Sequence, residues 1–235
     1  MSKKIQWISI VFTLVLIGWS YYQVNSYKSE MQALKKDKVE LEQEVQNMES
    51  QAQYILTQAN QKEVEMTHET WPKYFDIAEV MVEESEGKFL RPWAIYLVKE
   101  ADTYGIDPFI VYELLKIETG NSFDPDLVGP ETKYGHAYGM AQFMKNTAPW
   151  IADMADMPYE DELLFDPYYS IKLSLVYIDY LYDQYDNWDE TLTAYHRGMA
   201  GLEQYKLKNG HANSEYASRI QKNAQKYKEF VAYAP

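Results

Sequence analysis

The spacing of apolar residues divides the chain into three regions, and the first is a continuous apolar run. It extends without a charge from Ile5 to Tyr22, close to the ~20 residues that a helix needs to cross a bilayer. Lys3 and Lys4 precede it, which predicts a cytoplasmic N-terminus. A cleaved signal peptide is the competing interpretation, but no good small-x-small cleavage site follows the run. We therefore predict that residues 1–27 form a cytoplasmic tail and an uncleaved signal anchor of a single-pass membrane protein whose remainder is extracytoplasmic.

The second region, residues 28–70, combines a heptad repeat with a charged, Gln-rich composition. Two heptad positions are apolar: Met31, Val45, Ala52, Ala59 and Met66 occupy one, and Leu34, Leu41, Met48 and Ile55 occupy the other. Lys38 and Lys62 interrupt this seam. The pattern predicts a helical stalk of roughly 55 to 60 Å at ~1.5 Å per residue. We expect residues 31–66 to pair as a coiled coil, in a homodimer or with a partner helix; a single solvated helix is the alternative.

The third region, residues 71–235, has the periodicity of successive amphipathic helices and predicts an all-α domain. Trp71-Pro72 opens it, and Asp107-Pro108 supplies an N-cap and a first-turn proline for one of its helices. No alternating strand pattern is long enough for a sheet core. The helices are predicted over 73–86, 92–105, 108–118, 138–155, 167–186, 188–199 and 214–230.

Composition excludes several functions for this domain. A hydrophobic content of 46% with 15% aromatics indicates a folded chain, and a net charge of −14 argues against nucleic-acid binding, which needs a basic face. With no cysteine, there is no disulfide framework, thiolate nucleophile or Cys-based metal site. His68, His136 and His211 lack metal-ligand spacing, so we expect neither a metal nor another cofactor.

Glu118 is the acid whose position is least expected for a surface residue. In a helix over 108–118 it shares one face with Val111 and Leu114, and it occupies the last turn, where the helix dipole disfavours a carboxylate. Desolvation and the dipole both raise a carboxyl pKa, as a general acid near neutral pH requires. The alternative is an ordinary surface glutamate on a helix with another register.

Four ordered blocks of sequence carry a family resemblance over residues 90–230. They read YGIDPFIVYELLKIETGNSFDP, AYGMAQFMKNTA, FDPYYSIKLSLVYIDYL and LTAYHRGMAGLEQY. Together they resemble the SLT-type lytic transglycosylase catalytic domain, which has a lysozyme-like fold. The resemblance implies an enzyme that cleaves the β-1,4 bond between N-acetylmuramic acid and N-acetylglucosamine in peptidoglycan glycan strands and leaves a 1,6-anhydro ring, on the cell-wall side of the membrane.

The same resemblance implies the roles of individual residues. It makes Glu118 the single catalytic acid and base. It implies a second block, Gly139-Met140-Ala141-Gln142, a helix start at Asp166-Pro167, and a fourth block, Ala194-Tyr195-His196 followed by Gly198. The residues implied to bind substrate are Thr119, Gly139, Met140, Gln142, Tyr195, His196 and Tyr216.

The chain departs from the family pattern in several places. Thr119 replaces a serine and keeps its hydroxyl, Ala141 replaces a methionine, and Lys145 stands where a proline is usual. Ser170 replaces a structural asparagine. His196 replaces the asparagine after Tyr195 and adds a group that titrates near pH ~6.5.

Two other functions stay open on the sequence. One is a lysozyme-type hydrolase, in which a loop acid among Asp124, Asp126 and Glu131 serves as the second carboxylate that most glycosidases use. N-caps and solvated loop acids are the simpler interpretation of these three. The other is a non-catalytic scaffold that binds the wall within a secretion or conjugation complex, which the departures at Ala141 and His196 favour.

Overall fold

A computed structural model describes residues 70–228 without a break and single residues or short groups between Trp19 and Gln46. These two parts belong to separate compact units. Every described residue between 19 and 46 is helical. No helix in the described parts is both long and apolar enough to span a membrane. The predicted anchor over residues 5–22 lies almost entirely outside the described residues, as does the stalk beyond residue 46, so the anchor and the coiled coil stay predictions.

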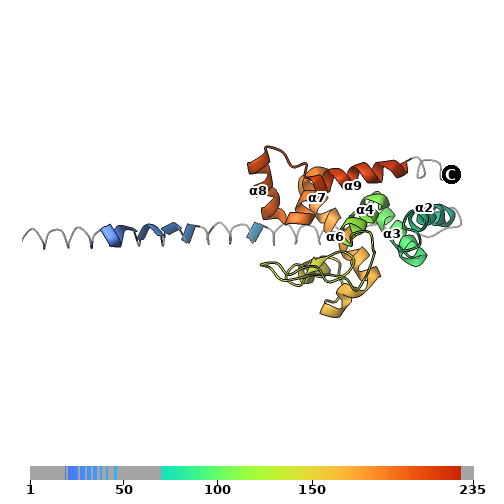
Figure 1. Ribbon diagram of the computed structural model, residues 1–235, viewed down its shortest axis with the longest axis horizontal. Coiled ribbons are helices and arrows are strands. Elements are labelled where there is room, and N and C mark those ends of the chain that lie inside the picture. Colours follow the sequence, from blue (N-terminus) through green and yellow to red (C-terminus); the bar gives the residue numbers. More distant parts are fainter. Residues whose placement is uncertain are drawn as a thin grey trace, which may run out of the picture. The chain divides into compact units, whose positions relative to one another are not determined.

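Residues 70–228 form a mostly helical domain, as the sequence predicts (Figure 1). Its helices are α2 (Thr70–Glu84), α3 (Arg91–Tyr104), α4 (Pro108–Glu118), α5 (Ala148–Met154), α6 (Pro167–Tyr185), α7 (Trp188–Arg197), α8 (Met199–Asn209) and α9 (Glu215–Ala224), with 3-10 turns η1 (Asp161–Phe165) and η2 (Gln225–Tyr227). The described strands, β1 (Ala137–Tyr138) and β2 (Phe143–Met144), form one antiparallel ribbon.

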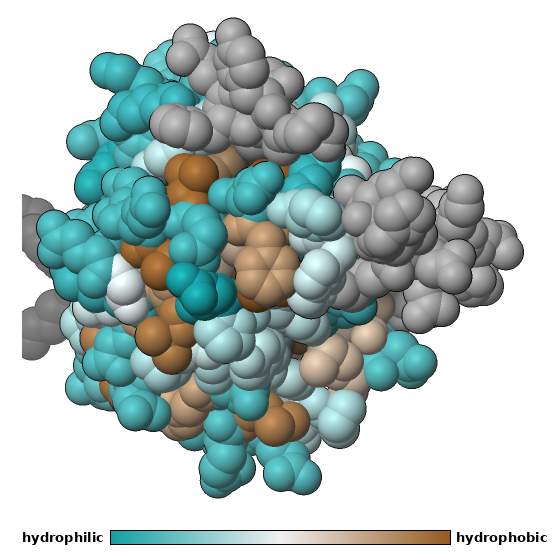
Figure 2. Space-filling view, turned by 90° about the vertical axis from the view of Figure 1, so that its right-hand side faces the viewer, coloured by the Kyte–Doolittle hydropathy of each residue, from teal (hydrophilic) through white to brown (hydrophobic). Residues whose placement is uncertain are grey.

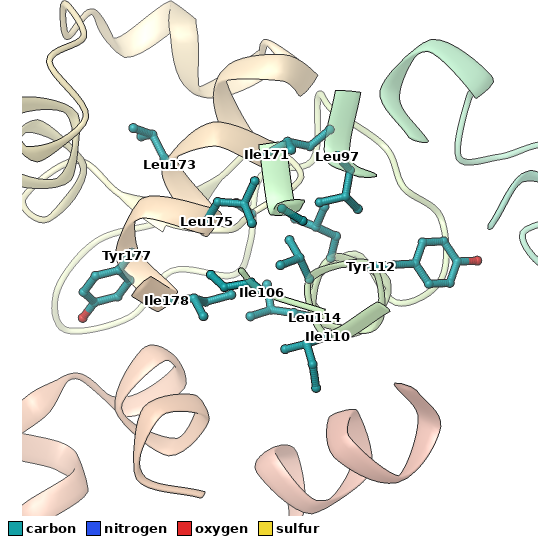
Figure 3. Packing of buried hydrophobic residues seen from close by; sticks show 14 of the residues in the cluster. Leu97, Ile106, Ile110, Tyr112, Leu114, Ile171, Leu173, Leu175, Tyr177 and Ile178 are labelled. Carbon is teal, nitrogen blue, oxygen red and sulfur yellow. The ribbon is translucent and has the colours of Figure 1, made fainter. Parts of the chain in front are cut away.

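Helix α4 lies at the centre of the core. All of its residues from Phe109 to Leu115 are buried, and a helix that is buried all round must be covered by its neighbours on every side. Its start is fixed by Asp107, whose side chain accepts a hydrogen bond of 2.9 Å from the backbone N–H of Phe109. Figure 3 shows Leu114 pointing toward Ile178 of α6 and Tyr112 pointing to the opposite side of α4.

The outer surface contrasts with this core. Figure 2 shows the face on which α2 lies, where hydrophilic residues predominate and hydrophobic ones form small groups between them. The buried apolar residues of α4 and α6 belong to one cluster, which also includes residues of α2, α3 and α7.

One predicted helix is wrong. Residues 138–155 contain the β1–β2 ribbon and a turn, and only Ala148–Met154 is helical. Gly139 and Gln142 both adopt positive φ angles, 70° and 53°, which a right-handed helix does not allow. The apolar residues of this stretch are buried, as in a helix, but through a turn.

The sequence also missed one helix and misplaced the end of another. Helix α8 has a single buried residue, Leu202, so it has no apolar stripe from which a helix could be predicted. The helix predicted over 214–230 ends at Ala224 and continues as the 3-10 turn η2.

Gly139 lies in the turn between β1 and β2, where its backbone packs closely against η1. A Cβ atom at this position would lie 1.7 Å from the carbonyl oxygen of Leu164, a backbone atom that cannot move aside cheaply. The hydroxyl of Ser170 donates to the same Leu164 oxygen at 3.1 Å. Ser170, which departs from the family pattern, therefore has a definite role, because it ties the start of α6 to the backbone beside Gly139.

We expect Gly139→Ala to lower the free energy of unfolding by more than about 3 kcal/mol, because it combines a backbone clash with a strained φ. Gly135→Ala is the matched control. Gly135 also has a positive φ, 99°, but open space surrounds its Cβ position, so a loss of only about 1 kcal/mol is expected. Chemical denaturation of the two variants would measure the difference, and equal losses would contradict the close contact at Gly139.

Candidate active site

Glu118 is the last residue of α4 and is only partly accessible to solvent. Burial raises the pKa of its carboxyl from the ordinary 4.5 to about 7, and a hydrogen bond from Tyr216 acts in the opposite direction. The Tyr216 hydroxyl donates this bond to Oε1 of Glu118 over 2.6 Å. The sequence predicts a raised pKa from burial and the helix dipole, and burial is the cause that raises it here.

Tyr216 reaches Glu118 because the start of α9 is fastened to α7. The Ser214 hydroxyl caps α9 by accepting a hydrogen bond of 3.2 Å from the N–H of Ala217. The Thr193 hydroxyl, on α7, lies 2.7 Å from the Ser214 hydroxyl and 2.7 Å from the carbonyl oxygen of Ala212. Thr193 and Ser214 are both buried, so this cap is protected from competition with water.

Tyr195 approaches Glu118 from α7, and its hydroxyl is bound elsewhere. The hydroxyl lies 3.2 Å from the Ser174 hydroxyl on α6 and donates to the Ala141 carbonyl oxygen at 3.3 Å. Burial and the nearby Glu118 charge hold the pKa of Tyr195 well above its usual range. Tyr195 therefore joins the turn after Gly139 to α6 and α7, beside the acid.

His196 packs against the ring of Tyr216, whose hydroxyl contacts Glu118. Its ring stacks on the Tyr216 ring, with centroids 4.5 Å apart and planes 9° apart. Burial, and then the neighbouring Arg197 charge, lower the pKa of His196 below its usual value. The imidazole is therefore neutral at pH 7, and its flat face supports the tyrosine that contacts Glu118.

The other residues expected to bind substrate support the backbone around the site. The Thr119 hydroxyl is buried, donates to the Leu115 carbonyl oxygen at 2.7 Å and accepts from the N–H of Phe123 at 3.0 Å. It thereby holds the chain as it leaves α4. A serine at this position offers the same hydroxyl, so this departure from the family pattern preserves the bonds.

The side chains of Met140 and Gln142, in the turn over 139–142, likewise pack against or bind the protein itself. Met140 is fully buried, and the Gln142 amide nitrogen donates to the carbonyl oxygens of Gly139 at 2.8 Å and Leu127 at 3.3 Å. The structure thus brings Glu118, Tyr195, His196 and Tyr216 together, whereas the Gln142 amide nitrogen is committed to the loop. Substrate binding by Thr119, Gly139, Met140 and Gln142 stays a prediction.

The three loop acids lie at the surface. Asp124, Asp126 and Glu131 are exposed, and Asp124 accepts a hydrogen bond of 3.0 Å from the N–H of Asp126, as in an ordinary turn. Within residues 70–228, none of them shifts the pKa of Glu118, for which burial and Tyr216 are the causes. Across the described parts of the chain, no group of three or more acidic, histidine or cysteine side chains could hold a metal ion.

The family model of the transglycosylase SLT domain matches residues 95–218, just over half of the chain. The chain belongs to the transglycosylase SLT domain family. No curated protein and no solved structure matched the chain in parallel comparisons. The family match runs from α3 into α9 and includes Glu118, Tyr195 and Tyr216.

Sequence reasoning did not find the supports of this SLT domain site. Thr193, Ser174 and Ser214 each hold a tyrosine or a helix end beside Glu118, and a second acid of α4, Glu113, is also buried. Of these, only Ser214 carries a local signal, as a serine placed before a helix that begins with Glu215. The others are recognisable only when distant segments are brought together.

We expect Glu118→Gln to stabilise the domain at high pH. Burial raises the pKa of Glu118 in the folded protein, so the wild type has its full free energy of unfolding below pH ~4.5. This free energy falls as the pH rises toward ~7, because Glu118 loses its proton at lower pH in the unfolded chain than in the folded one. A shift of this size corresponds to roughly 3 kcal/mol at pH ~8. Denaturant unfolding at low and high pH would measure it. Glu131→Gln, at an exposed acid, should change stability by under about 0.5 kcal/mol, and an equal effect of both substitutions would contradict the buried acid.

Proposed function

We propose that the chain is a membrane-anchored peptidoglycan lytic transglycosylase in which Glu118 serves as the single acid and base. The observation that supports this most directly is a buried carboxyl with a pKa of about 7 that accepts a hydrogen bond from Tyr216. Such a group is populated in both protonation states near neutral pH, which a residue that first donates and then accepts a proton requires.

The first step breaks the glycosidic bond. Protonated Glu118 donates its proton to the oxygen that links N-acetylmuramic acid to N-acetylglucosamine, and the bond from C1 of the muramoyl sugar to that oxygen breaks. The N-acetylglucosamine leaves with a free 4-hydroxyl, and an oxocarbenium-like centre develops at C1. The substrate's own 2-acetamido group can stabilise this centre, as in substrate-assisted glycosidases.

The second step closes the anhydro ring. The Glu118 carboxylate takes the proton of the muramoyl C6 hydroxyl, and that oxygen forms a bond to C1. Glu118 is again protonated, and no water is consumed. The Tyr216 hydroxyl favours the carboxylate form that exists between the two steps, because it donates a hydrogen bond to it.

The surroundings of Glu118 favour this route over hydrolysis. A hydrolase of the usual kind places a second carboxylate within about 5 to 10 Å of the first, as nucleophile or as base for water. In residues 70–228 the loop acids are exposed and leave the pKa of Glu118 unaffected. An intramolecular hydroxyl removes the need for such a group.

The test is to digest purified peptidoglycan with the full chain and determine the masses of the products. Anhydro-ended muropeptides are expected. Reducing ends would instead indicate a lysozyme-type hydrolase, and binding to the wall without any cleavage would indicate a scaffold. Glu118→Gln should reduce the rate by at least ~100-fold, in keeping with the loss of a general acid, whereas Glu131→Gln should retain wild-type activity.

We also propose that residues 5–22 anchor the enzyme in the cytoplasmic membrane, with residues 28–70 as a helical stalk. The uncharged run and the lysines before it support this proposal. Removing residues 1–27 should move the protein from the membrane fraction to the soluble fraction while it still yields anhydro products. N-terminal sequencing of the native protein provides the control, since a mature start near Tyr27 would indicate a cleaved signal peptide instead.

A further inference from the structure

Helix α4 carries a second buried carboxylate, Glu113, which also binds the C-terminal helix. Its side chain is 2% exposed. Oε2 accepts a hydrogen bond of 2.8 Å from the side-chain amide of Asn223, and Oε1 accepts one of 3.3 Å from the Tyr227 hydroxyl. Lys116, one turn along α4, places its ammonium 3.6 Å from Oε1. Because a buried carboxylate without partners is very costly, these contacts hold α9 and η2 against α4.

Together the two carboxylates of α4 hold α9 at two places. Glu118 binds Tyr216 near the start of α9, and Glu113 binds Asn223 near its end. Tyr216 and Asn223 are separated by two helical turns and therefore lie on one face of α9. Glu113 precedes Glu118 on α4, whereas its partner Asn223 follows Tyr216 on α9, so the two helices run antiparallel. The two contacts together fix the position of α9 along α4.

The contact at Glu118 is sensitive to this relative position. The Tyr216 hydroxyl lies 2.6 Å from the carboxylate, and a shift of about 1 Å that moves it directly away from Glu118 would take it beyond hydrogen-bonding distance. The Ser214 cap fixes the first turn of α9. Glu113 binds its second half to α4 through Asn223, and just beyond α9 the ring of Tyr227 stacks on Phe109 of α4. Stacking on His196 orients the Tyr216 ring without setting its distance from Glu118.

We propose that Glu113 is a positioning residue, which acts through Asn223 and α9 to keep the Tyr216 hydroxyl on Glu118. This rests on the proposed catalytic role of Glu118. The titratable groups beside Glu118 are Tyr216 and Tyr195. Beside Glu113 they are Lys116, Tyr227 and Tyr112, and both Lys116 and Tyr112 also bind Glu84 of α2. Weakening the Glu113 contact raises the pKa of Glu118, because the carboxylate loses the hydrogen bond that favours its charged form.

The test is the pKa of Glu118, measured in the full chain by NMR titration of labelled glutamate carboxyls, with Glu118→Gln to assign the signal. Tyr216→Phe sets the scale and should raise the pKa by about one pH unit, the effect of losing one hydrogen bond to a charged group. Asn223→Ala should raise it by a smaller amount. The double variant should match Tyr216→Phe alone, because both substitutions act on the same bond.

Glu100→Gln is the matched control. Glu100 is another largely buried acid, and it pairs with Lys172 at 2.7 Å between α3 and α6, away from α9. It should lower stability and leave the pKa of Glu118 unchanged. Glu113→Leu should raise the pKa of Glu118 as Asn223→Ala does, and if Glu113→Leu fails to fold, Asn223→Ala alone still tests the contact. An unchanged pKa in Asn223→Ala, or a shift that adds fully to that of Tyr216→Phe, would overturn the proposal.

Enzymatic measurements separate this inference from the proposed function. If the wild-type chain releases anhydro products, the upper limb of its kcat/KM profile should move to higher pH in Asn223→Ala, since Glu118 stays protonated to higher pH. If the wild-type chain releases no products, the proposed function fails, but the titration still decides whether Glu113 controls the bond between Tyr216 and Glu118.

Discussion

The hydrogen bond from Tyr216 to Glu118 joins two helices whose contacting residues are 98 positions apart, and it stabilises a carboxylate that burial disfavours. Two opposing effects therefore set the pKa. Burial at the end of α4 raises it, and the tyrosine limits the rise to about 7. Without burial the pKa of Glu118 would be lower, and without Tyr216 it would be higher. The position of α9, which carries Tyr216, is therefore as important as the burial itself.

Several contacts elsewhere in the domain hold α9 in its position relative to α4. Helix α4 is buried from Phe109 to Leu115 and provides a rigid base for the acid. The Thr193–Ser214 contact fastens α9 to α7, and Tyr195 joins α7 to α6 and to the turn after Gly139. Each contact is made by a hydroxyl group in an apolar setting, where an unsatisfied partner would be costly. The site is thus built from the same bonds that hold the helices together.

The sequence predicts the parts of this arrangement that depend on local chemistry. Helices α4 and α6 begin where Asp-Pro pairs place them, and the apolar stripe of α4 indicates the unusual position of Glu118. The turn after β1 was predicted as helix, because the close approach of the Leu164 backbone to Gly139 is made by a residue far along the chain. Helix α8 was missed because its surface lacks an apolar stripe.

The candidate site, like the fold, was predicted in part. The raised pKa of Glu118 follows from its place on α4, but its partner Tyr216 was associated with it only through the family resemblance. No rule of spacing relates α4 to α9, and Glu113, Thr193 and Ser174 acquire their roles only from contacts between distant segments. Local rules thus locate the acid, and the tertiary structure supplies the groups that tune it.

Helix α8 has a practical consequence for studying this domain. It begins at Gly198 and is followed by the segment that Thr193 and Ser214 secure, so both of its ends are fixed to the elements that carry Tyr195 and Tyr216. Leu202 is its one buried residue, Met199 packs against the core from its first turn, and Leu207 is 87% exposed. Exposed residues of α8 are therefore suitable attachment points for a fluorophore or spin label, which would report on the enzyme bound to an insoluble wall without altering the groups around the acid.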